Sequence, residues 1–187
     1  MRKDRLSLLH YLYLFLMQLA LAGIQAAALF MQFAFGETPC PLCLLQRVAM
    51  FGVSFGIIKN FREGFSARNA GLSMIFALLL PVISVRQTLL DIYPRPGHEY
   101  IGSAIFGLHM PVWSILIAAA LLLGFALKSA VLGGDDELTP LQKFPALEKA
   151  ANALSVLIVA LCAVNFASVV LQCGVDACHT YEYRLLR

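Results

Sequence analysis

Two pairs of closely spaced cysteines are the residues of this sequence most able to do chemistry. Cys40 and Cys43 stand in a Cys-x-x-Cys motif, and Cys173 and Cys178 form a second pair with four residues between them. A cysteine thiolate is a strong nucleophile, and neighbouring thiols exchange readily with disulfides. The two pairs therefore indicate thiol redox chemistry in a compartment that sustains disulfides.

The first pair is placed where a helix should begin, because Pro41 suits a first helical turn. The positive end of the helix dipole favours the thiolate form of both cysteines. Arg47 follows Cys43 by four residues, so its guanidinium lies over the same helix face and can stabilise a thiolate or an anionic ligand. We therefore expect Cys43 to contact a bound cofactor and Cys40 to exchange with another sulfur.

The second pair has a spacing that does not suit a disulfide within one continuous helix. Gly174 gives the segment the means to turn between Cys173 and Cys178. A static disulfide that fastens the tail is one alternative, and a zinc site that joins both pairs with His179 is another, although the spacing departs from common zinc sites. The fifth cysteine, Cys162, is expected to be a small core residue.

The elements that must position these cysteines are membrane-spanning helices. Of the 187 residues, 60% are hydrophobic and 13% charged, with a mean hydropathy of +0.78, which is typical of a chain dissolved in lipid. Stretches of roughly 20 apolar residues predict an all-α bundle in a single domain, residues 1–187, with no nucleic-acid partner. The five predicted spans are Leu8–Met31, Leu44–Ile58, Ala70–Leu90, Met110–Leu127 and Ala151–Leu171.

Basic residues indicate how this bundle is oriented. Nine Lys and Arg side chains lie before the first span or in the second and fourth connections, which predicts a cytoplasmic N-terminus by the positive-inside tendency. Five spans then place the C-terminus outside. Both cysteine pairs fall on that same external face.

Two further patterns lie near the predicted site. Gln18, Gln25 and Gln32 recur every seven residues, so they share one inward face of the first span, where they make interhelical hydrogen bonds or contact a ligand. In the connection Asp91–His109, the apolar residues of 100–108 are spaced like one face of a short interfacial helix that caps a pocket, with an ordinary connecting segment as the alternative.

Residues 39–52 (PCPLCLLQRVAMFG) and 107–113 (GLHMPVW) resemble the disulfide bond formation protein B (DsbB) family. The resemblance implies a bacterial inner-membrane thiol oxidoreductase that reoxidises a periplasmic DsbA-like dithiol oxidase and passes electrons to ubiquinone or menaquinone. It places the quinone-facing pair on Cys40 and Cys43, with Cys43 next to the quinone, and the quinone-binding arginine on Arg47.

The sequence also departs from the family pattern. Members carry a second cysteine pair between the third and fourth spans, whereas Asp91–His109 has none and a fifth span ends in Cys173 and Cys178. We therefore expect the tail pair to replace the loop pair as the dithiol that meets the soluble partner. Two other functions stay open: a quinone reductase similar to vitamin K epoxide reductase, and a non-catalytic membrane scaffold with structural disulfides.

Overall fold

A computed structural model describes residues 2–93, 104–132 and 139–174 and shows five long helices in these ranges. All five are long and apolar enough to cross a membrane, so the all-α, five-span prediction is confirmed and the chain is a multi-pass membrane protein. The helices are α1 (Arg2–Ala34), α2 (Pro41–Glu63), α3 (Ala67–Ile92), α4 (Met110–Leu127) and α5 (Pro145–Cys173). Shorter elements are strands β1 (Ala104–Ile105) and β2 (Leu108–His109), a π-turn at Lys128–Leu132 and a 3-10 turn at Leu141–Lys143.

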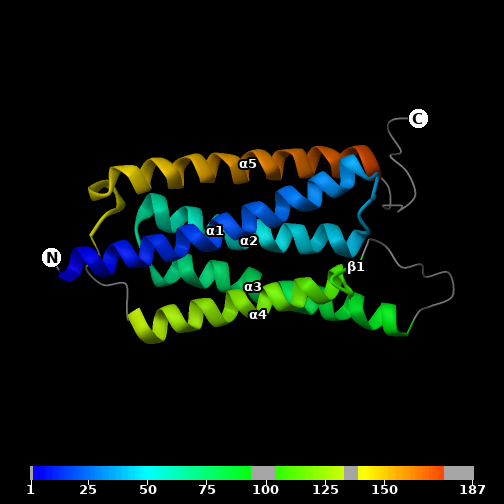
Figure 1. Ribbon diagram of the computed structural model, residues 1–187, viewed down its shortest axis with the longest axis horizontal. Coiled ribbons are helices and arrows are strands. Elements are labelled where there is room, and N and C mark those ends of the chain that lie inside the picture. The colour runs from blue at the N-terminus through cyan, green and yellow to red at the C-terminus, as the bar shows by residue number, and fades with distance from the viewer. Residues whose placement is uncertain (1, 94–103, 133–138, 175–187) are drawn as a thin grey trace.

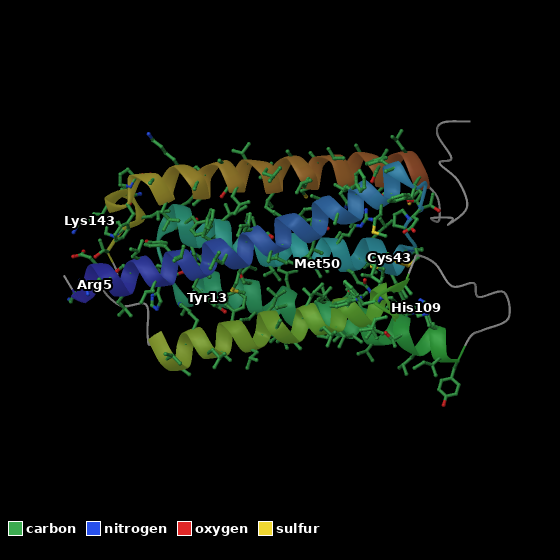
Figure 2. The ribbon with its side chains drawn as sticks, in the orientation of Figure 1. Arg5, Tyr13, Cys43, Met50, His109 and Lys143 are labelled. Atoms are coloured by element: carbon green, nitrogen blue, oxygen red, sulfur yellow. A yellow bond between two sulfur atoms is a disulfide. The ribbon has the colours of Figure 1, made fainter. Side chains whose placement is uncertain are left out.

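The five helices lie side by side along the long axis of the bundle (Figure 1). In that view α5 forms one edge, α3 and α4 form the opposite edge, and α1 and α2 lie between them. The first residues of α2 and the last residues of α5 lie at the same end, which we call the cysteine end. Arg5 and Lys143 mark the opposite end, and Cys43 and His109 lie toward the cysteine end (Figure 2).

Four of the five helices are longer than their predicted spans, and α4 has the predicted bounds. Helix α2, expected as the short span Leu44–Ile58, has 23 residues and runs to Glu63. Hydropathy detects only the part of a helix that is uniformly apolar, whereas caps decide where the backbone begins and ends. Cys40 caps the start of α2, and Gly64, with a φ of 88°, ends it in a conformation that favours glycine.

The outer surface of the bundle is covered by Leu, Val, Ile and Phe side chains that remain exposed, as lipid-facing helices require. The interior is apolar at its centre, where Leu21, Val53, Ile57 and Leu80 are buried in one cluster. It also contains buried polar groups. The predicted inward face of the first span is among them, because Gln18, Gln25 and Gln32 are all at most 1% exposed.

Two local predictions were wrong. Ala104, Ile105 and Leu108 do not belong to a helix, because strands β1 and β2 pair in an antiparallel hairpin; the residues of that predicted helix before 104 lie outside the described residues. Phe106 and Gly107 take positive φ values of 52° and 77° at its tip, and such a turn suits a hairpin rather than a helix. Cys162 is exposed on the outer surface of α5 and is not a core residue.

Candidate redox site

The first cysteine pair forms a disulfide at the start of α2. Cys40 and Cys43 are bonded through their sulfur atoms, with their Cα atoms 5.0 Å apart. Cys40 is the cap residue, and its sulfur also accepts a hydrogen bond from the Cys43 backbone N–H at 3.0 Å. The pair therefore lies at the N-terminal end of a helix, where the dipole stabilises a thiolate once the disulfide is reduced.

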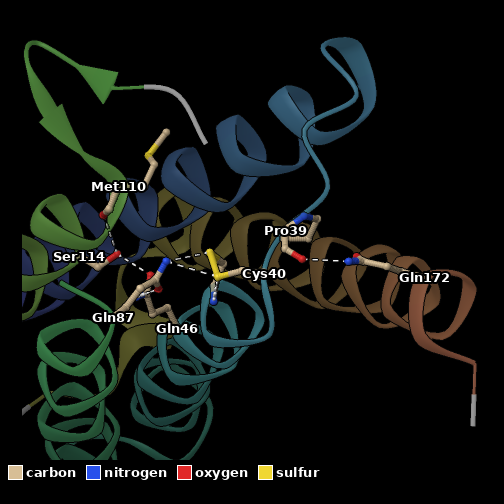
Figure 3. Close-up of a disulfide and its surroundings, with 8 residues drawn as sticks. Pro39, Cys40, Gln46, Gln87, Met110, Ser114 and Gln172 are labelled. Carbon is tan, nitrogen blue, oxygen red and sulfur yellow. Dashed lines mark hydrogen bonds between the residues drawn. A yellow bond between two sulfur atoms is a disulfide. The ribbon is translucent and has the colours of Figure 1, made fainter. Parts of the chain in front are cut away.

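A chain of three polar side chains connects this disulfide to α3 and α4 (Figure 3). Gln87 of α3 donates through Nε2 to the sulfurs of Cys40 and Cys43, at 3.3 Å each. Its Oε1 accepts a bond of 2.9 Å from Gln46 Nε2, and Gln46 Oε1 accepts a bond of 2.9 Å from the Ser114 hydroxyl. Sequence analysis did not single out these three residues, although polar side chains in an apolar span are the signal that points to them.

Arg47 lies one helical turn after Cys43, as predicted, and its guanidinium joins three helices. Its Nη1 donates to Gln32 Oε1 at 2.6 Å and to Asn165 Oδ1 at 3.1 Å, and its Nη2 donates to the Ala28 carbonyl oxygen at 3.1 Å. The Arg47 carbonyl oxygen in turn accepts a bond from Gln25 Nε2 at 3.0 Å. Two of the three predicted inward glutamines thus make interhelical bonds, whereas the amide atoms of Gln18 are buried without a hydrogen-bond partner among the described residues.

Cys43 and Arg47 both line one cavity of about 140 Å³ inside the bundle. Its wall is made by α1, α2 and α4 together with residues 37–39, and it combines apolar side chains with a few polar groups, as small-molecule sites do. The polar wall comes from Gln25, Gln32, Gln46, Arg47 and Ser114, and the apolar wall includes Ile24, Met31, Met50, Met110 and Trp113. Gln46 and Ser114, two members of the hydrogen-bond chain, therefore lie in the cavity wall.

The β1–β2 hairpin lies beside this cavity. The Trp113 indole Nε1 donates a hydrogen bond of 3.0 Å to the Ile105 carbonyl oxygen, and Trp113 itself lines the cavity. Phe106 at the hairpin tip is 93% exposed and makes an edge contact with the Trp113 ring at 6.5 Å between centroids. The segment predicted to cap the pocket thus contacts its wall, although as a hairpin.

The end of α5 meets the segment that precedes the disulfide. Gln172 Nε2 donates a hydrogen bond of 2.9 Å to the carbonyl oxygen of Pro39, the residue before Cys40 (Figure 3). The next residue, Cys173, is disulfide-bonded and 5% exposed, and Gly174 ends the helix with a φ of 62°. The predicted turn at Gly174 is therefore present. Cys178 lies outside the described residues, so its bond to Cys173 stays a prediction.

A metal centre receives no support from the described part of the chain. Within it, no group of three or more His, Cys, Asp or Glu side chains could hold a metal ion. Cys40 and Cys43, two of the ligands in the zinc alternative, are bonded to each other. His179, the proposed additional ligand, lies outside the described residues.

Comparisons with known proteins point to one family. Residues 10–100 match the family model described as disulfide bond formation protein DsbB. Relatives named disulfide bond formation protein B include one from Chromobacterium violaceum, 32% identical over 52% of this chain and 62% of the relative. A second, from Cupriavidus necator, is 30% identical over 44% of this chain and 52% of the relative. A third, from Pseudomonas syringae, is 37% identical over 31% of this chain and 37% of the relative. The chain thus matches less than two thirds of the length of these relatives, and no solved structure matches it. The matched residues 10–100 hold Cys40, Cys43 and Arg47, and by this match and these relatives the chain is similar to the DsbB family.

Proposed function

We propose that this protein is a thiol:quinone oxidoreductase of the bacterial inner membrane that reoxidises a periplasmic DsbA-like dithiol oxidase. The observation that carries the proposal is the position of Cys43. It belongs to a disulfide and lines, together with Arg47, a cavity inside a bundle of membrane-spanning helices. A redox-active sulfur next to a mostly apolar cavity with few polar groups suits electron transfer to a lipid-soluble ring.

The cavity fits the head of a quinone by size and by chemistry. A volume of about 140 Å³ is close to that of engineered cavities that hold one benzene ring. Met31, Met50 and Trp113 offer apolar contact to such a ring, and Gln46 and Arg47 can donate hydrogen bonds to its oxygens. A bound quinone would accept two electrons and two protons. Arg47 would stabilise negative charge near Cys43, because its guanidinium is held in place by three bonds to the neighbouring helices α1 and α5.

The burial of Cys40 supports entry of electrons through the tail pair. Cys40 and Cys173 are only 7% and 5% exposed, so a thiol on a folded partner has little access to either sulfur, and in the proposed route the partner attacks at Cys178. The Gln172–Pro39 hydrogen bond ties the end of α5 to the residue that precedes Cys40. In the proposed route the reduced partner forms a mixed disulfide with the tail pair, is released as a disulfide, and leaves two thiols at Cys173 and Cys178.

The second exchange passes those electrons to the quinone-facing pair. One tail thiolate attacks Cys40, the Cys40–Cys43 bond breaks, and closure of the tail disulfide leaves both thiols on the first pair. Two electrons and two protons move in each exchange, so no further reductant is needed. Cys43 then faces the cavity through which these electrons leave.

The orientation of the bundle belongs to the same proposal. The cysteine end would face the periplasm, with the N-terminus of α1 in the cytoplasm. Arg5 and Lys143 lie at the opposite end of the bundle from Cys43, as a basic cytoplasmic face would require (Figure 2).

Quinone binding can be tested through Trp113, the one tryptophan in the sequence. Quinones accept electrons from an excited indole at contact distance, so a short-chain quinone in the cavity should quench most of the intrinsic fluorescence with a saturable dependence on concentration. Free tryptophan in the same detergent is the control for collisional quenching. Quenching no stronger than in that control would contradict a quinone in this cavity and favour a non-catalytic scaffold.

A further inference from the structure

The contact of Gln87 with both sulfurs of the disulfide plays no part in the proposed route of electrons. Gln87 belongs to α3, is 5% exposed, and points its Nε2 at Cys40 and Cys43 from 3.3 Å each (Figure 3). A disulfide sulfur is a weak acceptor, whereas a thiolate is a charged and much stronger one. The contact therefore gains strength when the pair is reduced.

Two further side chains fix which end of the Gln87 carboxamide faces the sulfurs. Gln87 Oε1 accepts from Gln46 Nε2, and Gln46 Oε1 accepts from the Ser114 hydroxyl, both at 2.9 Å. Gln46 and Ser114 are buried as well, at 5% and 7% exposed. A reversal of the Gln87 amide would set two N–H groups against each other in a buried site, which is costly. The chain from α4 through α2 to α3 thus holds an N–H donor on the disulfide.

We propose that Gln87 is a positioning residue that raises the reduction potential of the Cys40–Cys43 pair by stabilising the thiolate formed when the disulfide opens. Gln46 and Ser114 hold it in the donating orientation. The idea rests on the proposed function for its purpose, since a pair of higher potential takes electrons more readily from the tail pair. Reduction breaks the S–S bond and adds two electrons, and stabilising the reduced form makes the disulfide a stronger oxidant.

The test is the equilibrium of the pair with dithiothreitol, measured on the purified full chain without oxygen. Dithiothreitol in large excess exhausts any bound quinone, and differential alkylation followed by mass spectrometry reads the Cys40–Cys43 peptide separately from that of Cys173. Gln87→Met keeps a side chain of similar length but removes the donor. The equilibrium constant should shift about tenfold toward the disulfide, which corresponds to about 30 mV.

Gln18→Met is the matched control, because Gln18 is equally buried in the bundle but has no hydrogen-bond partner among the described residues. It should leave the constant within twofold of the wild-type value. The proposal would be overturned if the equilibrium constant of the Gln87→Met variant stayed within twofold of the wild-type value. It would also be overturned if Gln18→Met shifted the constant as much as Gln87→Met does. No quinone takes part in this equilibrium. The proposal for Gln87 can therefore fail here while the proposed reaction with quinone stands, and the reaction with quinone can fail while the proposal for Gln87 stands.

A second variant keeps the proposal testable if Gln87→Met does not fold. Gln46→Met leaves Gln87 in place and removes only the group that orients it. The constant should then shift in the same direction by a smaller factor, about threefold, and Ser114→Ala should shift it less again. An unchanged constant in Gln46→Met would show that the orientation of Gln87 does not set the potential.

Discussion

Arg47 combines a proposed role at the cavity with structural hydrogen bonds that its position in the sequence does not reveal. The four-residue spacing from Cys43 predicted a guanidinium that stabilises charge beside a reactive sulfur. The structure adds that the same group binds oxygens of Gln32, Ala28 and Asn165, so it also joins α2 to α1 and α5. Since hydrogen bonds from charged groups are stronger than neutral ones, Arg47 contributes to stability as well as to the cavity.

Replacing Arg47 by Gln should therefore lower both activity and stability, with the larger effect on activity. Loss of a charged donor at the cavity should reduce kcat/KM for quinone by about 10- to 100-fold, equivalent to about 1.5–3 kcal/mol. The melting temperature in detergent should fall by a few degrees, because Gln can replace only part of the three contacts.

Arg62→Gln is the control for this measurement, because Arg62 is an exposed residue in the last turn of the same helix. Steady-state kinetics over a range of quinone concentrations should match those of the wild type. If Arg47→Gln also kept its kinetics and lost only stability, Arg47 would be a structural residue rather than part of a quinone site.

Among single residues, the sequence predicted those whose chemistry follows from their type and spacing. The Cys-x-x-Cys motif and the arginine one turn later lie together, as expected. Gln87 could not be found in the same way, since the side of the helix on which a polar residue lies depends on how α3 packs against α2. Its contact joins residues more than 40 positions apart in the sequence.

Among the helices, the contact between α2 and α3 bears directly on the site, because α2 carries the disulfide and α3 carries Gln87. These two helices pack against each other more extensively than any other pair of described elements. Gly56 makes the close approach possible: a Cβ at this position would lie 2.8 Å from the Asn69 carbonyl oxygen and 2.9 Å from the Ser73 backbone nitrogen. Small residues at helix contacts are typical of membrane bundles.

Gly56→Ala should therefore lower the free energy of unfolding by about 1–3 kcal/mol, because the added methyl group forces backbone apart. Gly71→Ala is the matched control on α3, where a Cβ would meet nothing within 4 Å. It should leave stability unchanged or raise it by up to about 1 kcal/mol through helix propensity. Thermal unfolding of the two variants in one detergent gives the comparison, and equal melting temperatures would contradict the close packing of α2 on α3.

The bounds of the helices and the fold of residues 104–109 could be predicted from the sequence only in part. Spans were found because apolar length is a strong signal. The ends of all but α4 were misplaced, because polar turns continue these helices beyond the apolar stretch. The apolar residues at 104–108 fit a helical spacing. They fold as a hairpin because Gly107 and Phe106 accept positive φ at the turn, and Trp113 binds the Ile105 carbonyl oxygen.

For the molecule as a whole, the number of spans decides what the cysteines can do together. An even number of helices separates the two pairs, which predicted that they would share one end, and α2 and α5 indeed place Cys40 and Cys173 there. This part of the fold could be predicted because it needs only a count of spans. The packing order of the five helices could not, since one sequence does not show which apolar faces meet.

The proposed orientation can be measured with reporters fused to each end of the chain. A reporter that works only in the periplasm should be active when fused after Arg187. A reporter that works only in the cytoplasm should be active when fused before Met1. The physical reason is the excess of Lys and Arg in the connections at the end opposite the cysteines. A cytoplasmic readout at Arg187 would contradict both the orientation and the role of the tail pair.

The role of the tail pair is tested by separating the two half-reactions. In a Cys173→Ser, Cys178→Ser variant, oxidation of the soluble dithiol partner should be lost, because no other route brings electrons to the buried Cys40 sulfur. The pair Cys40–Cys43, once reduced by dithiothreitol, should still be reoxidised by quinone at close to the wild-type rate. A purely structural disulfide would instead lower stability by about 2–5 kcal/mol and would slow both half-reactions together.

Cys162→Ser is the control for general effects of removing a thiol, because Cys162 is a free, exposed cysteine on the same helix. It should change neither half-reaction. If the double variant oxidised the partner at the wild-type rate, the partner would have to reach Cys40 directly despite its 7% exposure. The start of α2 would then have to open on binding, and the end of α5, held to Pro39 by Gln172, would be the element that moves aside.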